Sequence, residues 1–396
     1  MQHLLGGDMR MSMPGESPSN PTENVKKPSL NRLYFYLTEG CNLACRHCWL
    51  APPVDPNGDK YDFLPLQLFE HIIYEAKPLG LVGVRLTGGE PLMHPHFINL
   101  LEIVRREGLS LTVETNGMLC TSVIAREIAK SPEKHVSVSI DGVDAETHEW
   151  VRGIRGSFAK ALAAVRNLVE AGIRPQIVMT VMRQNAEQIE SIIIMAEKLG
   201  ASSVKFNIVQ PTARGEKMHT TEDVLTVEEL VRTGRHVEME LAPKTGMKLF
   251  FDYPIAFRSL KRISTGDGCS ACGILGILGV LPQGVFALCG IGKHVPELVF
   301  GRAGINRLSD VWYNNSTLEN LRRGLPERLE GICADCLMKH ICLGSCIAQN
   351  YYRTATLWSP HWFCGNAERA GIFPDSRRAT INGLKVNSLK ECSNLL

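Results

Sequence analysis

Three thiols lie close together in the stretch Cys41-Asn42-Leu43-Ala44-Cys45-Arg46-His47-Cys48, directly after the apolar run Leu33–Leu37. Thiolates bind soft iron, and a cluster of four irons needs four ligands. Three cysteines therefore leave one iron open, and an open metal position is where a cofactor or substrate binds. A structural zinc knot is the alternative, because a motif match is only a hypothesis.

Three further motifs follow the cysteine triplet, and each follows or ends a short apolar run. They are Thr87-Gly88-Gly89-Glu90-Pro91, Glu114-Thr115-Asn116-Gly117 and Ser137-Val138-Ser139-Ile140-Asp141-Gly142. In order and separation, these motifs and the triplet resemble those of radical S-adenosylmethionine (radical SAM) enzymes. The resemblance implies that the open iron binds the amine and carboxylate of SAM. Reductive cleavage of SAM then yields methionine and a 5′-deoxyadenosyl radical, so the cofactor supplies the difficult chemistry.

The first motif offers contacts for a cationic amine. Gly88 and Gly89 allow close approach of the backbone to a ligand, and Glu90 supplies an acceptor. A simple glycine-rich turn between strand and helix is the alternative. By resemblance, this stretch binds the amino group of SAM, Asn116 belongs to the cofactor site, and His47 stands where an aromatic residue usually packs on adenine. A surface histidine is the alternative for His47.

The later motifs supply candidates for the rest of the cofactor. By resemblance, Ser139 and Asp141 face the ribose hydroxyls or the methionine end of SAM. An Asp-Gly turn after a strand is the alternative. Arg152 is the candidate partner of the SAM carboxylate, with Arg155 as its competitor, and either could be a solvated surface arginine. No residue stands out as a catalytic acid or base.

Short apolar segments alternate with amphipathic ones from Leu33 to about Ile208, which predicts a parallel sheet covered by helices. The resemblance implies a partial (β/α)6 barrel, with sites at the carboxyl ends of the strands. The expected strands are Leu33–Leu37, Val82–Leu86, Ser110–Val113, Val136–Ile140, Gln176–Val181 and Val204–Val209. Expected helices include Leu64–Ala76, Phe97–Glu107, Phe158–Ala171 and Ala186–Leu199.

Composition limits the class of protein. With 44% hydrophobic and 21% charged residues, the 396-residue chain is typical of soluble globular proteins. A net charge of +2 argues against a broad nucleic-acid surface, and no apolar run is long enough for a membrane span. The polar first 30 residues lack the apolar core of an export signal, so we expect a cytoplasmic protein. The expected organisation is a disordered tail (1–30), a core (31–210), a connecting region (211–265), a cysteine-rich domain (266–370) and a C-terminal tail (371–396).

The chain contains thirteen cysteines, and eight of them lie between Cys269 and Cys364. In a reducing cytoplasm, metal binding is a better explanation for them than disulfides. From Cys272 onward the spacing resembles the SPASM extension of radical SAM enzymes. The resemblance implies two auxiliary four-iron clusters, for a total of three 4Fe-4S clusters. The first would use Cys269, Cys272, Cys289 and Cys346, and the second Cys333, Cys336, Cys342 and Cys364.

Two points in this assignment stay open. Paired cysteines also suit tetrahedral zinc, so two zinc sites are the alternative. Cys269 lies outside the seven-cysteine core of the extension, and without it the first auxiliary cluster has an open iron. Cys120 and Cys392 are left without a role.

The resemblance favours an enzyme that modifies a ribosomally made peptide by hydrogen abstraction and crosslinking. A radical SAM enzyme acting on a small molecule such as a haem precursor is the runner-up. A sulfatase maturase is disfavoured because Gly290 stands where that class carries an acidic base. A non-catalytic iron–sulfur electron carrier is disfavoured because it needs no SAM pocket.

The expected partners are a peptide substrate and an external electron donor such as flavodoxin or ferredoxin, with no nucleic acid and no membrane. About 30 residues precede the barrel, too few for a winged-helix leader-binding unit. A leader peptide would therefore need a separate recognition protein or another surface.

Overall fold

The computed structural model describes residues 27–264, 272–381 and 384–385. Its strands are β1 Arg32–Tyr36, β2 Gly83–Thr87, β3 Ser110–Thr115, β4 Lys134–Ser139, β5 Gln176–Val181, β6 Ser203–Ile208, β7 Lys248–Phe251, β8 Ile277–Leu281, β9 Val285–Ala287, β10 Val299–Arg302, β11 Thr380–Ile381 and β12 Leu384–Lys385. Its α-helices are α1 Leu66–Ala76, α2 Phe97–Arg106, α3 Ser122–Ala129, α4 Ala145–Arg152, α5 Ser157–Glu170, α6 Ile189–Leu199, α7 Arg214–Thr220, α8 Val227–His236, α9 Leu260–Ser264, α10 Leu308–Asn314, α11 Ser316–Gly324, α12 Gly331–Ala334, α13 Lys339–Cys342, α14 Ile347–Thr354 and α15 Trp362–Arg369.

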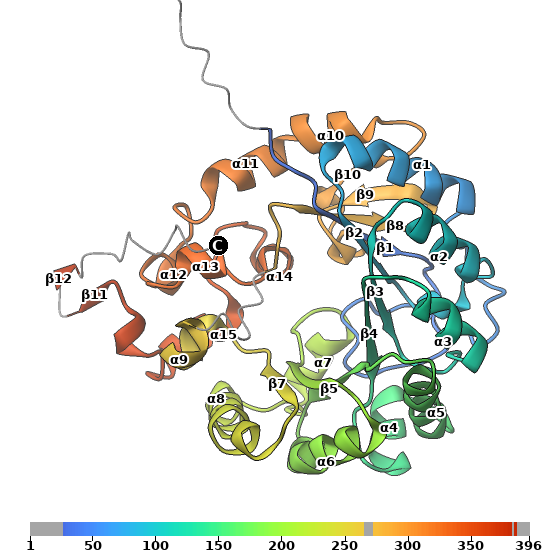
Figure 1. The fold of residues 1–396 in the computed structure, drawn as a ribbon. Coiled ribbons are helices and arrows are strands. Elements are labelled where there is room, and N and C mark those ends of the chain that lie inside the picture. Colours follow the sequence, from blue (N-terminus) through green and yellow to red (C-terminus); the bar gives the residue numbers. More distant parts are fainter. Residues whose placement is uncertain (1–26, 265–271, 382–383, 386–396) are drawn as a thin grey trace, which may run out of the picture.

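One ten-stranded sheet dominates the molecule, in the order β10-β9-β8-β1-β2-β3-β4-β5-β6-β7. Strands β1 to β7 run parallel in chain order, and helices α1 to α6 lie outside them (Figure 1). The predicted parallel α/β architecture is therefore confirmed. The six predicted strands are all present, each within two residues of its expected ends.

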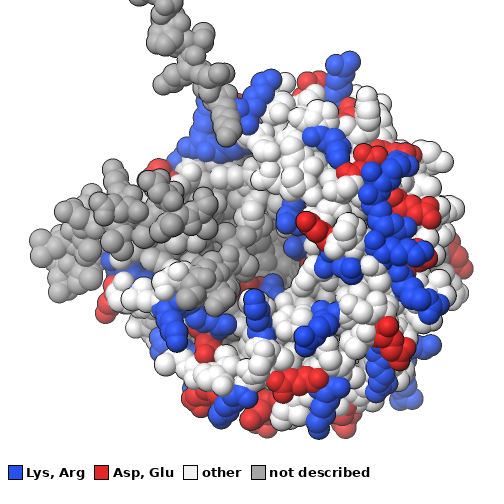
Figure 2. Space-filling model, in the orientation of Figure 1, with Lys and Arg blue, Asp and Glu red and all other residues white. Residues whose placement is uncertain are grey.

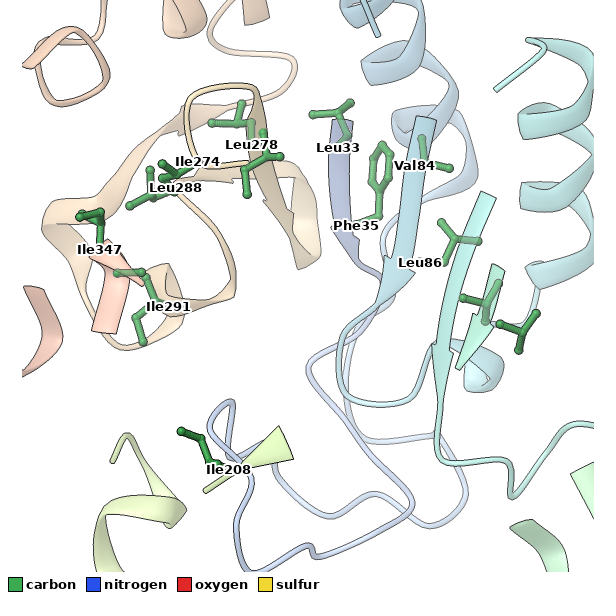
Figure 3. Packing of buried hydrophobic residues seen from close by; sticks show 14 of the residues in the cluster. Leu33, Phe35, Val84, Leu86, Ile208, Ile274, Leu278, Leu288, Ile291 and Ile347 are labelled. Atoms are coloured by element: carbon green, nitrogen blue, oxygen red, sulfur yellow. The ribbon is translucent and has the colours of Figure 1, made fainter. Parts of the chain in front are cut away.

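Apolar and polar side chains alternate along the strands, which gives the sheet one apolar and one polar face. Leu33 and Phe35 of β1 and Val84 and Leu86 of β2 are fully buried, and Figure 3 shows them on neighbouring strands of the core. The ring centroids of Phe35 and Phe69 in α1 lie 4.4 Å apart, so this face of the sheet packs on the helices. The intervening polar residues face the other side, because successive side chains of a strand alternate between faces.

The cysteine-rich part contributes to the same sheet. Strands β8 and β9 form an antiparallel hairpin, and β8 also pairs parallel with β1, which the sequence did not predict. Every residue of β8 is buried, so its backbone needs a hydrogen-bonded strand on both edges. Strand β9 lies on one edge and β1 on the other. Around this hairpin, Figure 3 shows Ile274, Leu278, Leu288, Ile291 and Ile347.

The connecting region adds β7 and α8. Thr226 and Glu229 form a capping box at the start of α8. Basic and acidic side chains are interspersed on the face shown in Figure 2. Among the helices of the described residues, none has the length and apolar character that crossing a bilayer requires.

Candidate active site

A cavity of about 510 Å³ lies on the polar face of the parallel strands and extends to their carboxyl ends. Every strand from β1 to β6 contributes to its lining. Side chains at alternate positions supply that lining, as Tyr34 and Tyr36, Arg85 and Thr87, Thr112 and Glu114, and Ser137 and Ser139 illustrate. Parallel α/β sheets place their sites at this edge.

The cysteine triplet lies at this cavity. Cys41 and Cys45 are buried, Cys48 is half-buried, and all three line the cavity wall. The loop is fixed where it begins, because Cys41 accepts a backbone hydrogen bond from Asp55 (2.7 Å) and donates one to Pro53 (3.1 Å). Burial raises the pKa of Cys41 and of Cys45, so both thiols are protonated until a metal displaces the proton.

Gly88 and Gly89 are required by the packing of the protein backbone around them. A Cβ on Gly89 would lie 1.6 Å from the carbonyl oxygen of Gly40, and Gly88 adopts a φ of +133° against the backbone of Leu37. The motif is thus packed on the residue before Cys41, and both glycines line the cavity. Close approach of their backbone to a ligand remains a prediction.

Glu90 is almost fully buried and has three donors of its own. It accepts hydrogen bonds from the Thr115 hydroxyl (2.6 Å), the Asn116 backbone (2.8 Å) and the Leu92 backbone (3.1 Å). Burial raises its pKa to about 7, although these donors oppose the shift. A carboxylate accepts about four hydrogen bonds, so one position remains for a ligand amine.

Asn116 joins three of the predicted motifs. Its Nδ2 lies 2.7 Å from Asn42 Oδ1 and 3.8 Å from Cys41 Sγ, while its backbone donates to Glu90. Asn116 therefore positions the cysteine loop, and it also lines the cavity.

Arg152 and Asp141 form a buried ion pair. The distance from Arg152 Nε to Asp141 Oδ2 is 2.5 Å, and Arg152 also donates to Cys45 Sγ at 3.5 Å. Asp141 is fully buried and accepts from the Thr180 backbone at 2.8 Å. Arg152 lines the cavity, whereas Asp141 does not, and the competing Arg155 is exposed and outside the lining. Asp141 is thus placed to orient Arg152, and its contact with SAM remains a prediction.

Ser139 and His47 also line the cavity. The Nδ1 atom of His47 is buried without a hydrogen-bond partner, and burial lowers the pKa of the ring to about 4. His47 is therefore neutral at physiological pH, as a ring that packs against a nucleobase would be. Every predicted cofactor residue except Asp141 lines this one cavity.

Three of the first auxiliary cysteines, Cys272, Cys289 and Cys346, line the same cavity as the triplet. Burial raises the pKa of Cys289 to about 12. The fourth expected ligand, Cys269, lies outside the described residues. The chain thus brings its N-terminal triplet and three C-terminal thiols to the wall of one cavity.

The second auxiliary group is separate. Cys333, Cys336, Cys342 and Cys364 line a small pocket together with apolar residues such as Ile255. Cys333 and Cys364 share a hydrogen bond, and burial raises the pKa of Cys336 to about 11. Over the described ranges, no three His, Cys, Asp or Glu side chains converge tightly enough for a single metal ion. Iron binding by both groups remains a prediction.

Sequence reasoning missed several polar residues that line the cavity. Arg85 pairs with Glu114 (2.9 Å), and Lys205 pairs with Asp252 (3.5 Å). The Oε1 atom of Gln349, a residue with only 8% of its surface exposed, has no hydrogen-bond partner among the residues that the structure describes. The alternation of polar and apolar residues in the strands was the available signal for Arg85 and Glu114. No comparable pattern marked Gln349, which the fold brings in from α14.

The chain has relatives over most of its length. The model of the radical SAM superfamily matches residues 35–196. An AdoMet-dependent heme synthase of Methanosarcina barkeri is 30% identical over 83% of this chain and 94% of its own. The mycofactocin maturase MftC of Mycobacterium ulcerans is 28% identical over 88% of this chain and 91% of its own.

A solved structure has a similar fold. The crystal structure of Streptococcus suis SuiB bound to its precursor peptide SuiA superimposes with a TM-score of 0.67 at 18% identity, over 90% of this chain and 84% of that one. Sequence relatives, fold and the position of the cysteine triplet agree with the resemblance stated from the motifs. The chain belongs to the radical SAM superfamily.

Proposed function

We propose that this enzyme modifies a ribosomally made peptide, abstracting a hydrogen atom and forming a crosslink. As a radical SAM protein it uses SAM and one iron–sulfur cluster, and Cys41, Cys45 and Cys48 are the residues that would bind that cluster. When bound, these groups supply reductive cleavage of SAM to a 5′-deoxyadenosyl radical. Gly88, Gly89, Glu90 and Arg152 would position SAM.

One observation carries the proposal: a single polar cavity reaches both the triplet and three C-terminal cysteines. A crosslink removes two hydrogens from the substrate, so after losing a hydrogen atom to the radical the substrate must also lose one electron and one proton. A chamber that also touches Cys272, Cys289 and Cys346 fits a protein that binds an electron acceptor beside its substrate. We propose auxiliary 4Fe-4S clusters at both C-terminal groups.

The lining suits a peptide. Gln349 Oε1 and Asn207 Oδ1 are buried acceptors without hydrogen-bond partners in the described part of the chain, and both residues line the cavity. An unpaired buried acceptor costs free energy, which a backbone N–H of a bound peptide would offset. The maturase name of the Mycobacterium ulcerans relative and the peptide-bound SuiB structure support the same substrate class.

A small-molecule substrate is the second candidate, because the Methanosarcina barkeri relative is named a heme synthase. A haem precursor carries carboxylates, and Arg85 and Lys205 are cations of the cavity wall. Both cations are already paired with Glu114 and Asp252, which favours the peptide.

The test is anaerobic incubation of reconstituted enzyme with SAM, reductant and candidate precursor peptides, read by mass spectrometry. We expect a peptide that loses two hydrogens, and no change without SAM or in the Cys41→Ala/Cys45→Ala/Cys48→Ala variant. Turnover of a haem precursor in matched reactions that leave every peptide unmodified would replace this proposal by the second candidate. A flavodoxin or ferredoxin as donor, a separate leader-recognition protein and a cytoplasmic location remain predictions.

A further inference from the structure

Arg377 lies beside the second group of C-terminal cysteines. Its backbone carbonyl accepts a hydrogen bond from Leu337 at 2.9 Å, and Leu337 directly follows Cys336. The next residue, Arg378, forms an isolated antiparallel bridge with Cys336. Arg377 is a buried residue, with 8% of its surface exposed. Its guanidinium lies close enough to the Cys336 thiol to oppose the rise in that thiol's pKa that burial causes.

The neighbouring arginine shows what is unusual about Arg377. Arg378 pairs with three carboxylates, those of Glu368 (3.3 Å), Asp375 (3.5 Å) and Asp335 (3.7 Å). Arg377 pairs with no carboxylate in the part of the chain that the structure describes. Its Nη2 donates to the Arg258 carbonyl at 3.1 Å, and its Nε has no hydrogen-bond partner.

Arg258 adds a second buried cation. It has 6% of its surface exposed, its Nη2 donates weakly to the Phe251 carbonyl at 3.4 Å, and its Nε is also without a partner. Glu238 and Arg258 are both electrostatic neighbours of Tyr253. Glu238, however, is paired with Arg262 at 3.4 Å. Two buried arginines, linked through the Arg258 carbonyl, therefore have no carboxylate partner among the described residues.

Such an arrangement is destabilising unless a negative charge compensates it, because an unpaired buried charge keeps the full penalty of losing its hydration. The four thiols nearby become thiolates when they bind metal. Lys339 also lines their pocket, but it is paired with Glu327 at 3.6 Å. Among the described residues, Arg377 and Arg258 are left with backbone carbonyls but no carboxylate as partners.

We infer that Arg377, supported by Arg258, is the internal counter-charge of an anionic metal–thiolate cluster on Cys333, Cys336, Cys342 and Cys364, and raises the reduction potential of that cluster. Reduction adds an electron to the cluster, and a nearby fixed positive charge favours the more negative state. Arg377 therefore acts on the cluster through its charge and does not bind iron. This inference rests on the second auxiliary site of the proposed function.

The test is an anaerobic redox titration followed by electron paramagnetic resonance, on the full-length chain with Cys41, Cys45 and Cys48 replaced by Ala. The signal of the second site is identified as the one lost on Cys364→Ala. Arg377→Gln should lower its midpoint potential so that about tenfold less cluster is reduced at a fixed potential, which is about 59 mV for a one-electron couple. Arg377→Lys, which keeps the charge, should shift it less.

Arg378→Gln is the matched control, because its three carboxylates already neutralise it, and it should leave the potential unchanged. If Arg377→Gln keeps its iron and its potential, the inference is wrong while the site stands. If the unaltered protein has no iron at these cysteines, the site and the inference both fall. Should Arg377→Gln lose iron, retention of iron by Arg377→Lys supports the role of charge, and equal loss in both variants overturns it.

Discussion

The carboxylate of Asp141 lies 2.5 Å from Nε of Arg152, in an ion pair almost completely withdrawn from solvent. The two atoms do not make a hydrogen bond, so the contact is electrostatic. The same guanidinium donates to Cys45 Sγ, and the Arg152 carbonyl accepts from the Ala44 backbone at 3.0 Å. The end of β4, the end of α4 and the middle of the cysteine loop are therefore held together by one arginine.

The first prediction concerns this ion pair. Asp141→Asn leaves Arg152 buried and unpaired, which should destabilise the protein by about 3 kcal/mol or more. Anaerobic thermal unfolding should show a clear fall in the midpoint. Glu127→Gln, which breaks solvent-accessible, partly exposed pairs with Lys130 and Arg105, should barely move it. Equal midpoints for the two variants would contradict the role given to Asp141.

The direction of the pKa shift of Asp141 determines how the stability contributed by this ion pair depends on pH. Burial raises the pKa of Asp141, but Arg152 and the neighbouring histidines lower it more, so the net pKa lies below the ordinary value. The pair then contributes stability at every pH above the ordinary aspartate range, and loses it only as the pH falls below that range.

The second prediction assigns the SAM-cleaving cluster. Replacing Cys41, Cys45 and Cys48 by Ala should abolish formation of 5′-deoxyadenosine, because these thiols line the cavity that reaches Glu90 and Arg152. Iron should fall from about twelve atoms to about eight per chain, as for the loss of one of three four-iron clusters. SAM cleavage by the triple variant under dithionite would refute the assignment.

The third prediction separates cysteines that bind iron from one that does not. Cys120 is buried in the apolar core, and burial raises its pKa to about 12. Cys289 is beside Cys272 and Cys346 in the cavity. Cys289→Ala should lose about four irons, whereas Cys120→Ala should keep the full content. Stoichiometric zinc in place of the missing iron would support zinc sites instead.

Much of this arrangement could be predicted from the sequence, because its determinants are local. The strands carry period-two patterns, and the triplet, the Gly88-Gly89-Glu90 stretch and Asn116 each follow a strand. Parallel strands bring such positions to one edge, so the fold assembled them as expected.

The remaining features depend on contacts between distant segments. The pairing of β8 with β1 joins residues more than 240 positions apart, and no local pattern specifies it. The sequence interprets Gly88 and Gly89 as residues that let a ligand approach. In the structure, the backbone of Leu37 and Gly40 already leaves no room for a side chain at either position. The contacts of Asp141 with Arg152 and Thr180 also join distant segments, and its predicted contact with SAM stays a prediction. Side-chain partners of this kind appear only in three dimensions.

The fourth prediction concerns Glu90. Burial raises its pKa to about 7, so the apo protein takes up a proton there near neutrality. A raised carboxyl pKa favours folding at low pH, and this contribution disappears as the pH rises from about 4.5 to about 7. Because a cationic amine needs the carboxylate form, SAM affinity should rise through about pH 7. Calorimetric titration at pH 6 and pH 8 should show this rise, and Glu90→Gln should weaken binding and flatten it without loss of iron. An unchanged pH dependence in that variant would remove Glu90 from the SAM site.

The last prediction concerns Gly290, which directly follows Cys289. A Cβ at this position would lie 2.5 Å from Cε1 of Tyr36 and 2.7 Å from Cδ2 of Leu50, and both of these side chains are buried. Gly290→Ala should therefore destabilise the protein by about 1–3 kcal/mol, as overpacking of a core does. It should also lower the iron content by displacing Cys289. Gly246→Ala, where a Cβ meets no atom within 4 Å, is the matched control and should have neither effect.

The same contact explains why an acidic residue is absent at position 290. The ring of Tyr36 occupies the space that an aspartate side chain would need, so Gly290→Asp should be more destabilising than Gly290→Ala. Tyr36→Ala should restore part of the stability of Gly290→Ala in a double-mutant cycle, because it removes the atoms that clash. Additive effects of the two substitutions, or a Gly290→Ala protein with full stability and iron, would show that Tyr36 does not determine the residue after Cys289.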